Sequence, residues 1–522
     1  MSLFKSSFLF ATGTLLSRLT GVLRESVLAG VFGAGLLLDA FLVANRIPNL
    51  LRELLAEGAL GASFTKVFSS LKETDPVRAR TFLFQSFVFF SSLIILVCVL
   101  GMVFSPELVK VMTLFMEQTE ARQQFFHDTV GLTRLLFPFI SFMTIGAIAS
   151  GVLHHNGRFF LSAISSVALN CGYILGALVF AQVLVRYGPE WVDLYIAEKT
   201  ITGLAVGVLV GGLVQMVIQI AGIWRTEVRG QKPITTFPWS ADVKKVCVLM
   251  FPMIVAGSAG QVNVLINTNF ATSLAEGAVT WLNFAFRLLQ LPIGMFAVGV
   301  GVVALPALSK VVTTHDKRLI AEKLQDALTL VLWLVIPCFS FFLMNSLPSV
   351  QFVYQHGQFG SGATLATADA LYFYSFSLIG YGLMKVLTSF YYAVERTGFA
   401  MRTSLFSIGV NALANYFLVN VYGHSGLAMT TSVVLSLNAL ILLAGLRKEK
   451  LLWDKPKWLR NLALLFLGLV LSALAQHWIL ALSQEFLIVN LSLKQTSLLT
   501  LTLNGSVVGS LFFLLWRRSR GS

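Results

Sequence analysis

Apolar stretches of about twenty residues recur along the whole chain, and this pattern constrains the fold more than any other feature. A helix needs about 20 mostly apolar residues to cross a bilayer. Hydrophobic residues make up 56% of the 522 positions and charged residues 12%, whereas soluble proteins carry roughly 25% charged residues. The sequence therefore predicts an all-α polytopic membrane protein with about 14 transmembrane helices, centred near residues 20, 50, 92, 142, 172, 211, 257, 293, 335, 378, 409, 436, 469 and 506.

The net charge of +14 comes from basic residues whose positions along the chain indicate membrane topology. A nucleic-acid-binding domain needs its basic residues clustered on one solvated face, but here most of the 38 Lys and Arg fall in alternate connections between apolar stretches. Cytoplasmic loops of membrane proteins carry such an excess. We therefore expect no nucleic-acid partner, an even number of spans and both termini in the cytoplasm.

Two segments of equal length repeat one another. PNLLRELLAEGALGASFTK runs from Pro48 to Lys66, and PIGMFAVGVGVVALPALSK runs from Pro292 to Lys310. They lie in the second and the eighth predicted helix. An offset of six helices is even and preserves orientation, so the repeats should be parallel and related by a pseudo-twofold axis along the membrane normal. Both helices exceed one span and should bend or protrude.

The predicted organisation follows from this repeat. It comprises an N-terminal six-helix lobe, a basic cytoplasmic linker, a C-terminal six-helix lobe and a C-terminal helix pair, at residues 1–222, 223–242, 243–446 and 447–522.

Four arginines lie inside predicted spans. Arg18, Arg24 and Arg52 belong to the first two segments, and Arg287 stands alone in WLNFAFRLLQLP. An arginine at the centre of a lipid-exposed helix costs roughly 2.5–3.5 kcal/mol, so these side chains must face water or one another. The planar guanidinium matches phosphate bidentately. Because the arginines of the first lobe outnumber the nearby acids, they predict a water-filled cavity for a phosphate-bearing ligand.

Other charged residues allow a structural interpretation. Asp39, Arg46 and Glu53 recur every seven residues on one helical stripe, with Glu57 one turn further. Alternating signs of this kind also form ion pairs between helices, or reach the membrane interface by snorkelling. Lys385 lies near the cytoplasmic end of its span, where snorkelling and a role in the cavity are both open.

Motifs for catalysis and nucleotide binding are missing from the sequence. It contains no GxxxxGK[ST], HExxH or GxSxG, so no ATP-binding loop and no enzymatic activity are predicted. The four cysteines lie in apolar stretches without CxxC spacing, and no metal or other cofactor is expected. Transport energy should come from gradients or the membrane potential, which is worth about 2.3 kcal/mol per elementary charge per 100 mV.

The opening segments GTLLSRLTGVLRESVLAGVFGAG and DAFLVANRIPNLLRELLAEGALGASF resemble the MurJ (MviN) family of bacterial lipid II flippases. This family belongs to the multidrug/oligosaccharidyl-lipid/polysaccharide exporter superfamily. The resemblance continues through FRLLQLPIGMFAVGVGVVALPALSK and YQHGQF to the C-terminal helices, and so covers essentially the whole chain.

The resemblance implies a function and a site. Lipid II, the undecaprenyl-pyrophosphate-linked disaccharide pentapeptide, would cross the bacterial cytoplasmic (inner) membrane to the periplasmic leaflet by alternating access. The last two helices would form a groove for its tail, and membrane lipids would surround a monomer. The family's substrate-binding residues correspond to Arg18, Arg24, Asp39, Arg52, Arg287 and Lys385.

This sequence departs from the family at two places. Phe286 and Gln290 stand beside Arg287 where family members can carry acidic residues, and the seventh helix offers asparagines rather than acidic sodium ligands. Sodium coupling is therefore not predicted. Two alternative functions stay open, namely export of another polyprenyl-linked oligosaccharide and a non-transporting scaffold for envelope synthesis. A third possibility, an exporter of cationic drugs, is disfavoured because it would need an acidic cavity, whereas the predicted cavity is lined by arginines.

Overall fold

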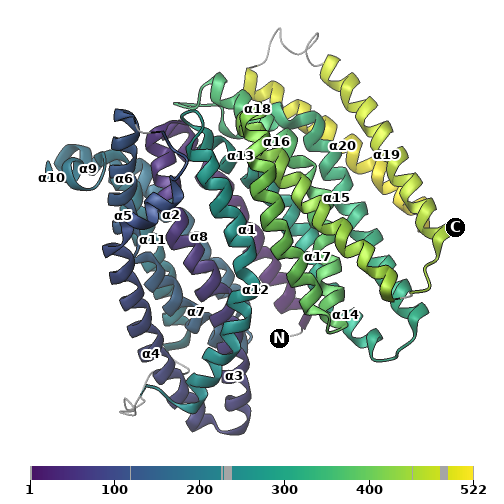
Figure 1. The fold of residues 1–522 in the computed structure, drawn as a ribbon, viewed down its shortest axis with the longest axis horizontal. Helices are drawn as coiled ribbons and strands as arrows, with labels where there is room; N and C mark the ends of the chain where they lie inside the picture. The colour runs from purple at the N-terminus through teal and green to yellow at the C-terminus, as the bar shows by residue number, and fades with distance from the viewer. Residues whose placement is uncertain are drawn as a thin grey trace. The chain divides into compact units, whose positions relative to one another are not determined.

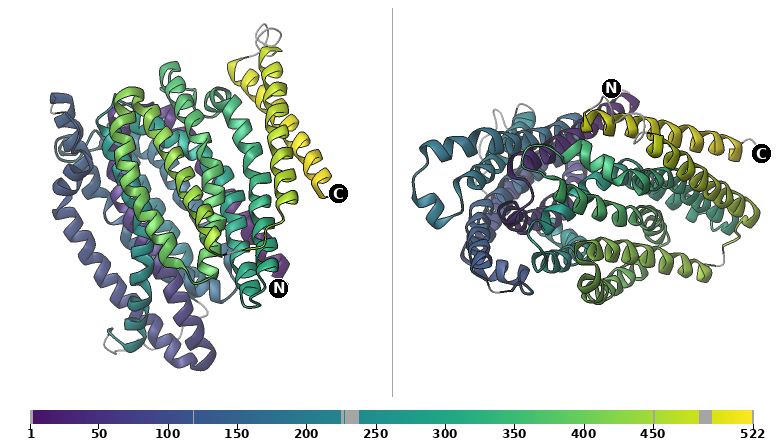
Figure 2. Two further views of the ribbon diagram at one scale, coloured as in Figure 1. Left: turned by 45° about the vertical axis from the view of Figure 1, so that its right-hand side comes forward. Right: turned by 90° about the horizontal axis from the view of Figure 1, so that it is seen from above.

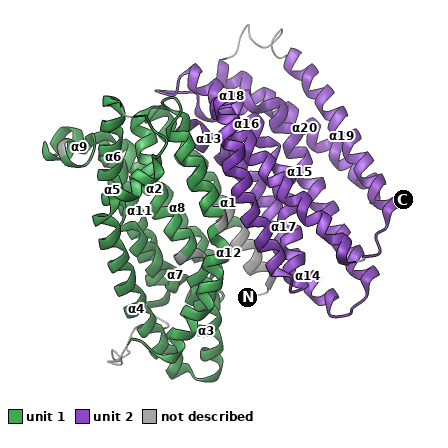
Figure 3. Cartoon of the chain, in the orientation of Figure 1, with its two compact units in different colours: residues 1–280 green, residues 281–522 purple. Residues whose placement is uncertain are grey.

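The computed structural model describes residues 3–117, 119–224, 227, 238–449, 451–482 and 492–520, and the chain divides into two compact units, Met1–Thr280 and Trp281–Ser522 (Figure 3). Unit 1 contains, in chain order, α1 (Leu3–Phe32), α2 (Leu36–Leu51), η1 (Arg52–Leu60), α3 (Gly61–Thr74), α4 (Pro76–Val103), α5 (Ser105–Met112), α6 (Glu120–Leu136), α7 (Phe139–His155), α8 (Phe159–Leu175), η2 (Gly176–Phe180), α9 (Ala181–Tyr187), α10 (Trp191–Tyr195), α11 (Lys199–Ile223) and α12 (Ala241–Thr272).

Helix α13 (Ala278–Pro292) begins in the last residues of unit 1 and continues into unit 2. The remaining elements of unit 2 are η4 (Ile293–Ala297), α14 (Val298–Val312), α15 (Lys317–Tyr354), α16 (Ser361–Ser375), α17 (Ser377–Ala393), α18 (Thr397–Gly445), η5 (Leu446–Glu449), α19 (Lys455–Leu482) and α20 (Leu493–Arg520). Figure 1 labels most of these helices along the chain, and Figure 2 shows them from two further directions.

The predicted all-α polytopic fold is confirmed, and each of the fourteen predicted centres lies in a helical segment. By length and apolar composition, nine helices among the described residues are able to cross a membrane, or up to eleven if two bent pairs each count as one span. The number fourteen is therefore not confirmed by this criterion. The criterion leaves out α1 and α2, whose charged residues lower their hydropathy, and it counts α18 once although Gly423 breaks it with a φ of 56°.

Short polar side chains mark where several helices begin. The Asp75 carboxylate accepts hydrogen bonds from the backbone N–H groups of Val77 and Arg78 at 3.1 and 3.0 Å, and Pro76 occupies the first helical position of α4. Ser240 and Asp316 cap α12 and α15 in the same way. Such caps satisfy N–H groups that have no partner within their own helix, so these helix starts follow from local sequence.

Both repeated segments contain a proline followed by a π-helical stretch. In the first, Pro48 lies inside α2, η1 follows, and α3 continues the helix to Thr74. In the second, Pro292 ends α13 and is followed directly by η4 and α14. Proline lacks the N–H that an α-helix needs, and π-helical turns often lie at functional sites. The shared pattern supports the predicted repeat.

At 1.5 Å per residue, the run from α2 to α3 extends roughly 60 Å, about twice the hydrocarbon thickness of a bilayer. The predicted excess length of this segment is therefore present. Helix α12 groups with unit 1 by its contacts, whereas the boundary predicted at residues 223–242 rests on the internal repeat. That boundary stays a prediction, and most of the predicted linker lies outside the described residues.

Unit 1 depends on close backbone contact between α8 and α11. Gly172 of α8 and Gly176 of η2 face Gly203, Gly207 and Gly211 of α11. A Cβ atom added at Gly207 would lie closer than 3.0 Å to the backbone of both Gly172 and Gly176. Small residues at such spacing let membrane helices approach and gain van der Waals contact where no hydrophobic effect operates. Helix α8 also contacts α1, so this packing influences where α1 lies within unit 1.

Unit 2 fastens its last two helices with buried polar side chains. Asn345 of α15 donates to the Gln476 side-chain carbonyl of α19 at 2.7 Å, and Asn504 of α20 donates to the Asn345 side-chain carbonyl at 2.6 Å. Gln476 also donates to Ser340 at 3.1 Å. Hydrogen bonds of this kind hold membrane helices in one register, so α19 and α20 attach to α15 specifically.

We expect Gly207→Ala to destabilise the protein by roughly 1–3 kcal/mol, because the added methyl group overpacks a backbone contact. The measurement is thermal unfolding of the purified protein in detergent. Gly409→Ala is the matched control, since a Cβ at Gly409 meets no atom within 4 Å, and it should leave stability unchanged or slightly raised. Equal melting temperatures for the two variants would contradict the proposed packing.

Candidate functional site

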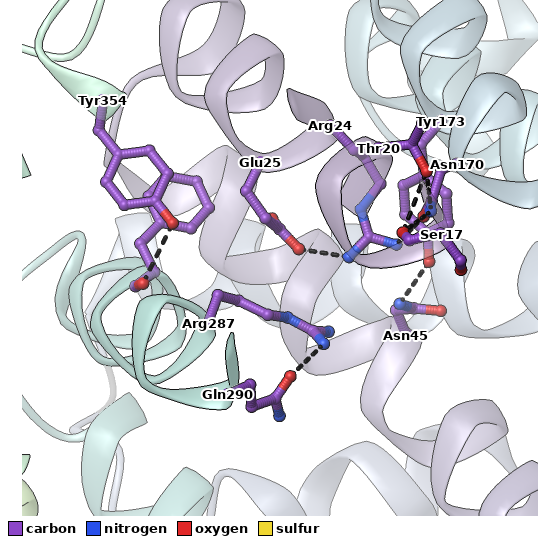
Figure 4. A network of polar contacts seen from close by, with 11 residues as sticks. Ser17, Thr20, Arg24, Glu25, Asn45, Asn170, Tyr173, Arg287, Gln290 and Tyr354 are labelled. Atoms are coloured by element: carbon purple, nitrogen blue, oxygen red, sulfur yellow. Dashed lines mark hydrogen bonds and ion pairs between the residues drawn. The ribbon is translucent and has the colours of Figure 1, made fainter. Parts of the chain in front are cut away.

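Arg24 lies on α1 and is held by side chains of α8. Its Nη1 donates a hydrogen bond to Asn170 Oδ1 at 3.1 Å, and its guanidinium carbon lies 4.4 Å from the ring centroid of Tyr173. Its Nη2 forms an ion pair with Glu25, and only 11% of the arginine side chain is exposed. Figure 4 shows these contacts. The buried arginine is therefore fixed in position by an amide, a ring and a carboxylate.

The two α8 residues that hold Arg24 are themselves positioned. Asn170 Nδ2 donates to the Ser17 carbonyl and to Thr20 Oγ1, both at 3.0 Å. The Tyr173 hydroxyl accepts a hydrogen bond from Asn45 of α2 at 3.0 Å. We call Arg24, Asn45, Asn170 and Tyr173 the arginine network. It joins α1, α2 and α8, so the orientation of the guanidinium depends on the packing of three helices.

Arg52 begins the π-helical segment η1 and has different partners. Its Nε donates to Asn49 Oδ1 at 2.9 Å, and its Nη2 lies 3.7 Å from the Glu53 carboxylate. Glu53 accepts further hydrogen bonds from Asn49 at 2.9 Å and from Gln261 of α12 at 2.8 Å. Glu53 thus connects η1 to α12, which favours the structural interpretation of this acid.

Asp39 of α2 is buried against the start of α13. Its carboxylate accepts hydrogen bonds from the backbone N–H groups of Gly277 and Thr280 at 2.8 Å, and from Thr280 Oγ1 at 2.6 Å. A carboxylate at a helix N-terminus satisfies free N–H groups and the positive end of the helix dipole. The structure therefore gives Asp39 contacts that position the first turn of α13, the helix that carries Arg287.

The candidate residues of unit 2 lie on α13 and α17. Arg287 Nη1 donates to Gln290 Oε1 one turn further along α13, at 3.0 Å (Figure 4). Lys385 Nζ lies 5.2 Å from the ring centroid of Tyr381, one turn earlier on α17. The backbone of Gly301 on α14 packs against Lys385. An aromatic face attracts a cation at such a distance, so Lys385 is turned toward its own helix.

The structure brings some predicted residues into defined networks and leaves others apart. Arg24 and Arg52 each have a carboxylate neighbour, Glu25 and Glu53. Arg18 is half-buried on α1. That the four predicted arginines converge on one water-filled cavity stays a prediction. The side chain of Glu57 lies outside the described part of the chain.

Asn45, Asn170 and Tyr173 were not singled out from the sequence. The signal for Asn170 was present, because it is the only amide side chain in the apolar stretch FFLSAISSVALNCGYIL. Polar residues inside membrane helices commonly hydrogen-bond across helices. The partner of such a residue comes from a distant segment, and this pairing could not be found by spacing along the chain. Across the described residues, no three His, Cys, Asp or Glu side chains gather as a metal site.

The sequence model of the family described as "Lipid II flippase MurJ" matches residues 28–497 of this chain. The "Lipid II flippase MurJ" of Burkholderia cenocepacia is 32% identical over 481 residues, which cover 92% of this chain and 90% of that protein. The "Probable lipid II flippase MurJ" of Vibrio cholerae is 29% identical over 455 residues, which cover 86% and 83% of the two chains.

Solved structures show the same fold at lower identity. A structure described as "Lipid II flippase MurJ, inward closed conformation" matches with a TM-score of 0.75 and 24% identity, over 97% of this chain and 99% of that chain. An inward-facing multidrug resistance MATE family transporter of the MOP superfamily matches with a TM-score of 0.64 and 14% identity, over 83% and 94%. These likenesses establish the architecture of the chain.

We expect Tyr173→Phe to lower stability by roughly 0.5–1.5 kcal/mol, because it keeps the ring beside Arg24 and removes only the acceptor of the Asn45 hydrogen bond. Asn170→Leu, which removes three hydrogen bonds at once, should cost more. Thermal unfolding in detergent measures both. Tyr416→Phe, at an exposed tyrosine, is the matched control and should have no effect. If Tyr416→Phe and Tyr173→Phe lowered stability equally, the arginine network would not contribute to folding.

Proposed function

The chain belongs to the lipid II flippase MurJ family, and on that premise we propose that it moves lipid II from the cytoplasmic to the periplasmic leaflet of a bacterial inner membrane by alternating access. The observation that carries this proposal is the family match, which extends over residues 28–497. This range includes Asn45, Asn170 and Tyr173 of the arginine network and begins just after Arg24. The relatives are transporters by name, and the proposal assigns no catalytic step to this chain.

Arg24 is the proposed primary ligand of the pyrophosphate. A guanidinium fork fits a phosphate group with two parallel hydrogen bonds, and the charge-assisted bonds strengthen where water is excluded. Two of the Arg24 nitrogens already bond to Asn170 and Glu25. An incoming phosphate would replace the Glu25 carboxylate while Asn170 and Tyr173 keep the guanidinium in place. Glu25 thus substitutes for the substrate when the cavity is empty, and it avoids the cost of an unpaired buried charge.

The other candidate residues have assigned roles within this proposal. Arg18 and Arg52 extend the positive lining from α1 and η1, and Arg287 supplies a contact from α13. Lys385 would leave the Tyr381 ring to meet the headgroup. Asp39 serves as a positioning residue, because its carboxylate holds the first turn of the helix that presents Arg287.

The lipid tail would lie along the C-terminal helices. Phe466 and Leu474 of α19 and Phe513 and Leu514 of α20 are all exposed, as expected of side chains that contact acyl or polyprenyl chains. Both termini are assigned to the cytoplasm because basic residues concentrate in the connections on that side. An inside-negative potential then favours outward movement of the anionic headgroup by about 2.3 kcal/mol per charge per 100 mV.

We expect Arg24→Ala and Arg287→Ala to abolish growth when the variant is the only flippase in a depleted strain. Arg24→Lys should restore growth partly at most, since lysine keeps the charge but lacks the fork. The readout is colony formation, alongside immunoblots of membrane fractions that verify equal protein amounts. Arg186→Ala, at an exposed arginine of α9, is the control and should support full growth.

The alternative hypothesis, that the protein is a scaffold without transport activity, predicts a different result. It would support growth with Arg24→Ala as long as the protein accumulates normally. Full complementation by both Arg24→Ala and Arg287→Ala would exclude the proposed pyrophosphate site. An exporter of another polyprenyl-linked oligosaccharide would fail to replace the depleted lipid II flippase even with the unchanged sequence.

A further inference from the structure

A cavity of about 790 Å³ lies in unit 2, where the start of α19 meets the end of α20 and the first half of α15. Its volume falls within the range of about 300–1,000 Å³ that is usual for small-molecule sites. All three helices carry polar residues at this end. The charged residues of its lining are Asp326, Asp454, Lys457 and Arg460.

From this lining we infer that the cavity binds the headgroup of an aminophospholipid, a lipid that carries a phosphate and a primary ammonium. Lys457 and Arg460 supply two positive charges, and Asp326 and Asp454 supply two negative charges. A purely anionic headgroup would meet two carboxylates. A headgroup without hydrogen-bond donors would add nothing to the hydrogen bonds that Asp326 and Asp454 accept from Lys457. A zwitterion with N–H donors matches both signs of the lining.

Trp333 gives independent support for a polar ligand. It lines the cavity and only 5% of the residue is exposed, yet its indole Nε1 has no hydrogen-bond partner among the described residues. A buried indole N–H normally has a partner. A phosphate oxygen would satisfy it, and the neighbouring lysine and arginine would neutralise the phosphate charge.

The existing contacts of the charged residues allow them to exchange partners. Lys457 Nζ lies 3.1 Å from Asp326 Oδ1, but 43% and 45% of the two side chains are exposed. Exposed ion pairs contribute little net free energy, so a headgroup can separate this pair and satisfy both members. Arg460 Nη2 donates to the Ser519 carbonyl at 3.0 Å, which fixes the guanidinium at the edge of the cavity.

The surroundings place the cavity at the level of lipid headgroups. Trp333 and Trp516 both line it, and Trp453 and Trp458 lie near the start of α19 with ring centroids 5.9 Å apart. Tryptophan is enriched at membrane–water interfaces. Trp333 also packs in an apolar cluster with Leu465, Val508 and Phe512 from α19 and α20. Leu459 and Leu467 of α19 are exposed, so a bound phospholipid can place its headgroup in the cavity and its acyl chains along this helix.

The experiment measures lipid binding to the purified full-length protein by native mass spectrometry. Phosphatidylethanolamine, phosphatidylglycerol and phosphatidylcholine with identical acyl chains are titrated separately. We expect phosphatidylethanolamine to bind about tenfold more tightly than the other two, because only its headgroup combines a positive charge with N–H donors. The hydroxyl groups of phosphatidylglycerol are uncharged donors, and the quaternary ammonium of phosphatidylcholine has no N–H. Tighter binding of phosphatidylglycerol or phosphatidylcholine, or equal binding of all three, would overturn the proposal.

Three variants test the residues. Asp326→Asn should abolish the preference for phosphatidylethanolamine. Arg460→Gln should weaken the binding of all three lipids. Trp333→Phe should also weaken the binding of all three, because it removes one hydrogen-bond donor. Lys455→Gln is the matched control, because it removes a positive charge from the same helix at a position outside the cavity lining. If Lys455→Gln weakened binding as much as Arg460→Gln, a general effect of charge would replace the proposed site.

Melting temperatures of all variants separate misfolding from loss of binding, and Trp333→Phe provides a test that changes no charge. The measurement uses no lipid II, so its failure would leave the transport proposal intact. Conversely, Arg24→Ala should bind phosphatidylethanolamine as the unchanged protein does, whatever its effect on growth.

Discussion

The high cost of a bare charge in a bilayer determines how this protein arranges its polar residues. Arg24 is the sharpest case, because it lies in a largely apolar helix whose other charged residues are Lys5, Arg18 and Glu25. The protein stabilises it with Asn170, Tyr173 and Glu25. These partners tie α1 to α8, and Asn45 adds α2. The contacts that make the arginine tolerable in a membrane also fix the orientation of the guanidinium on which the proposed phosphate site depends.

The same constraint explains how the helices are joined elsewhere. Lipid is as apolar as leucine, so apolar burial does not drive membrane helices together. Unit 1 uses the backbone contact between α8 and α11 at Gly172 and Gly207. Unit 2 uses hydrogen bonds among Asn345, Gln476 and Asn504. Each set of contacts fixes a register between helices. The first includes α8, which carries part of the arginine network, and the second attaches the apolar C-terminal helices to α15.

Charged residues have two proposed roles in this chain, and the two groups of residues differ in how deeply they are buried. Arg24 and Arg52 each have several defined partners, and the proposed function makes them ligands for one pyrophosphate. The residues around the cavity of unit 2 are balanced in sign and more exposed, with Lys457 and Asp326 as an example. A balanced, solvated lining suits a resident membrane lipid, whose headgroup has both signs. The two sites would therefore discriminate between two phosphate-bearing lipids through their acidic residues.

The sequence by itself determined the all-helical membrane fold, the family and the candidate arginines, because apolar length and misplaced charge are properties of a single segment. It also located the repeated segments, and each proved to contain a proline and a π-helical stretch. Only the tertiary structure decided the partners. Asp39 contacts the first turn of α13 and Asn170 contacts Arg24, more than a hundred residues away in each case. Such pairs depend on which helices pack together, and that packing leaves no periodic trace in the sequence.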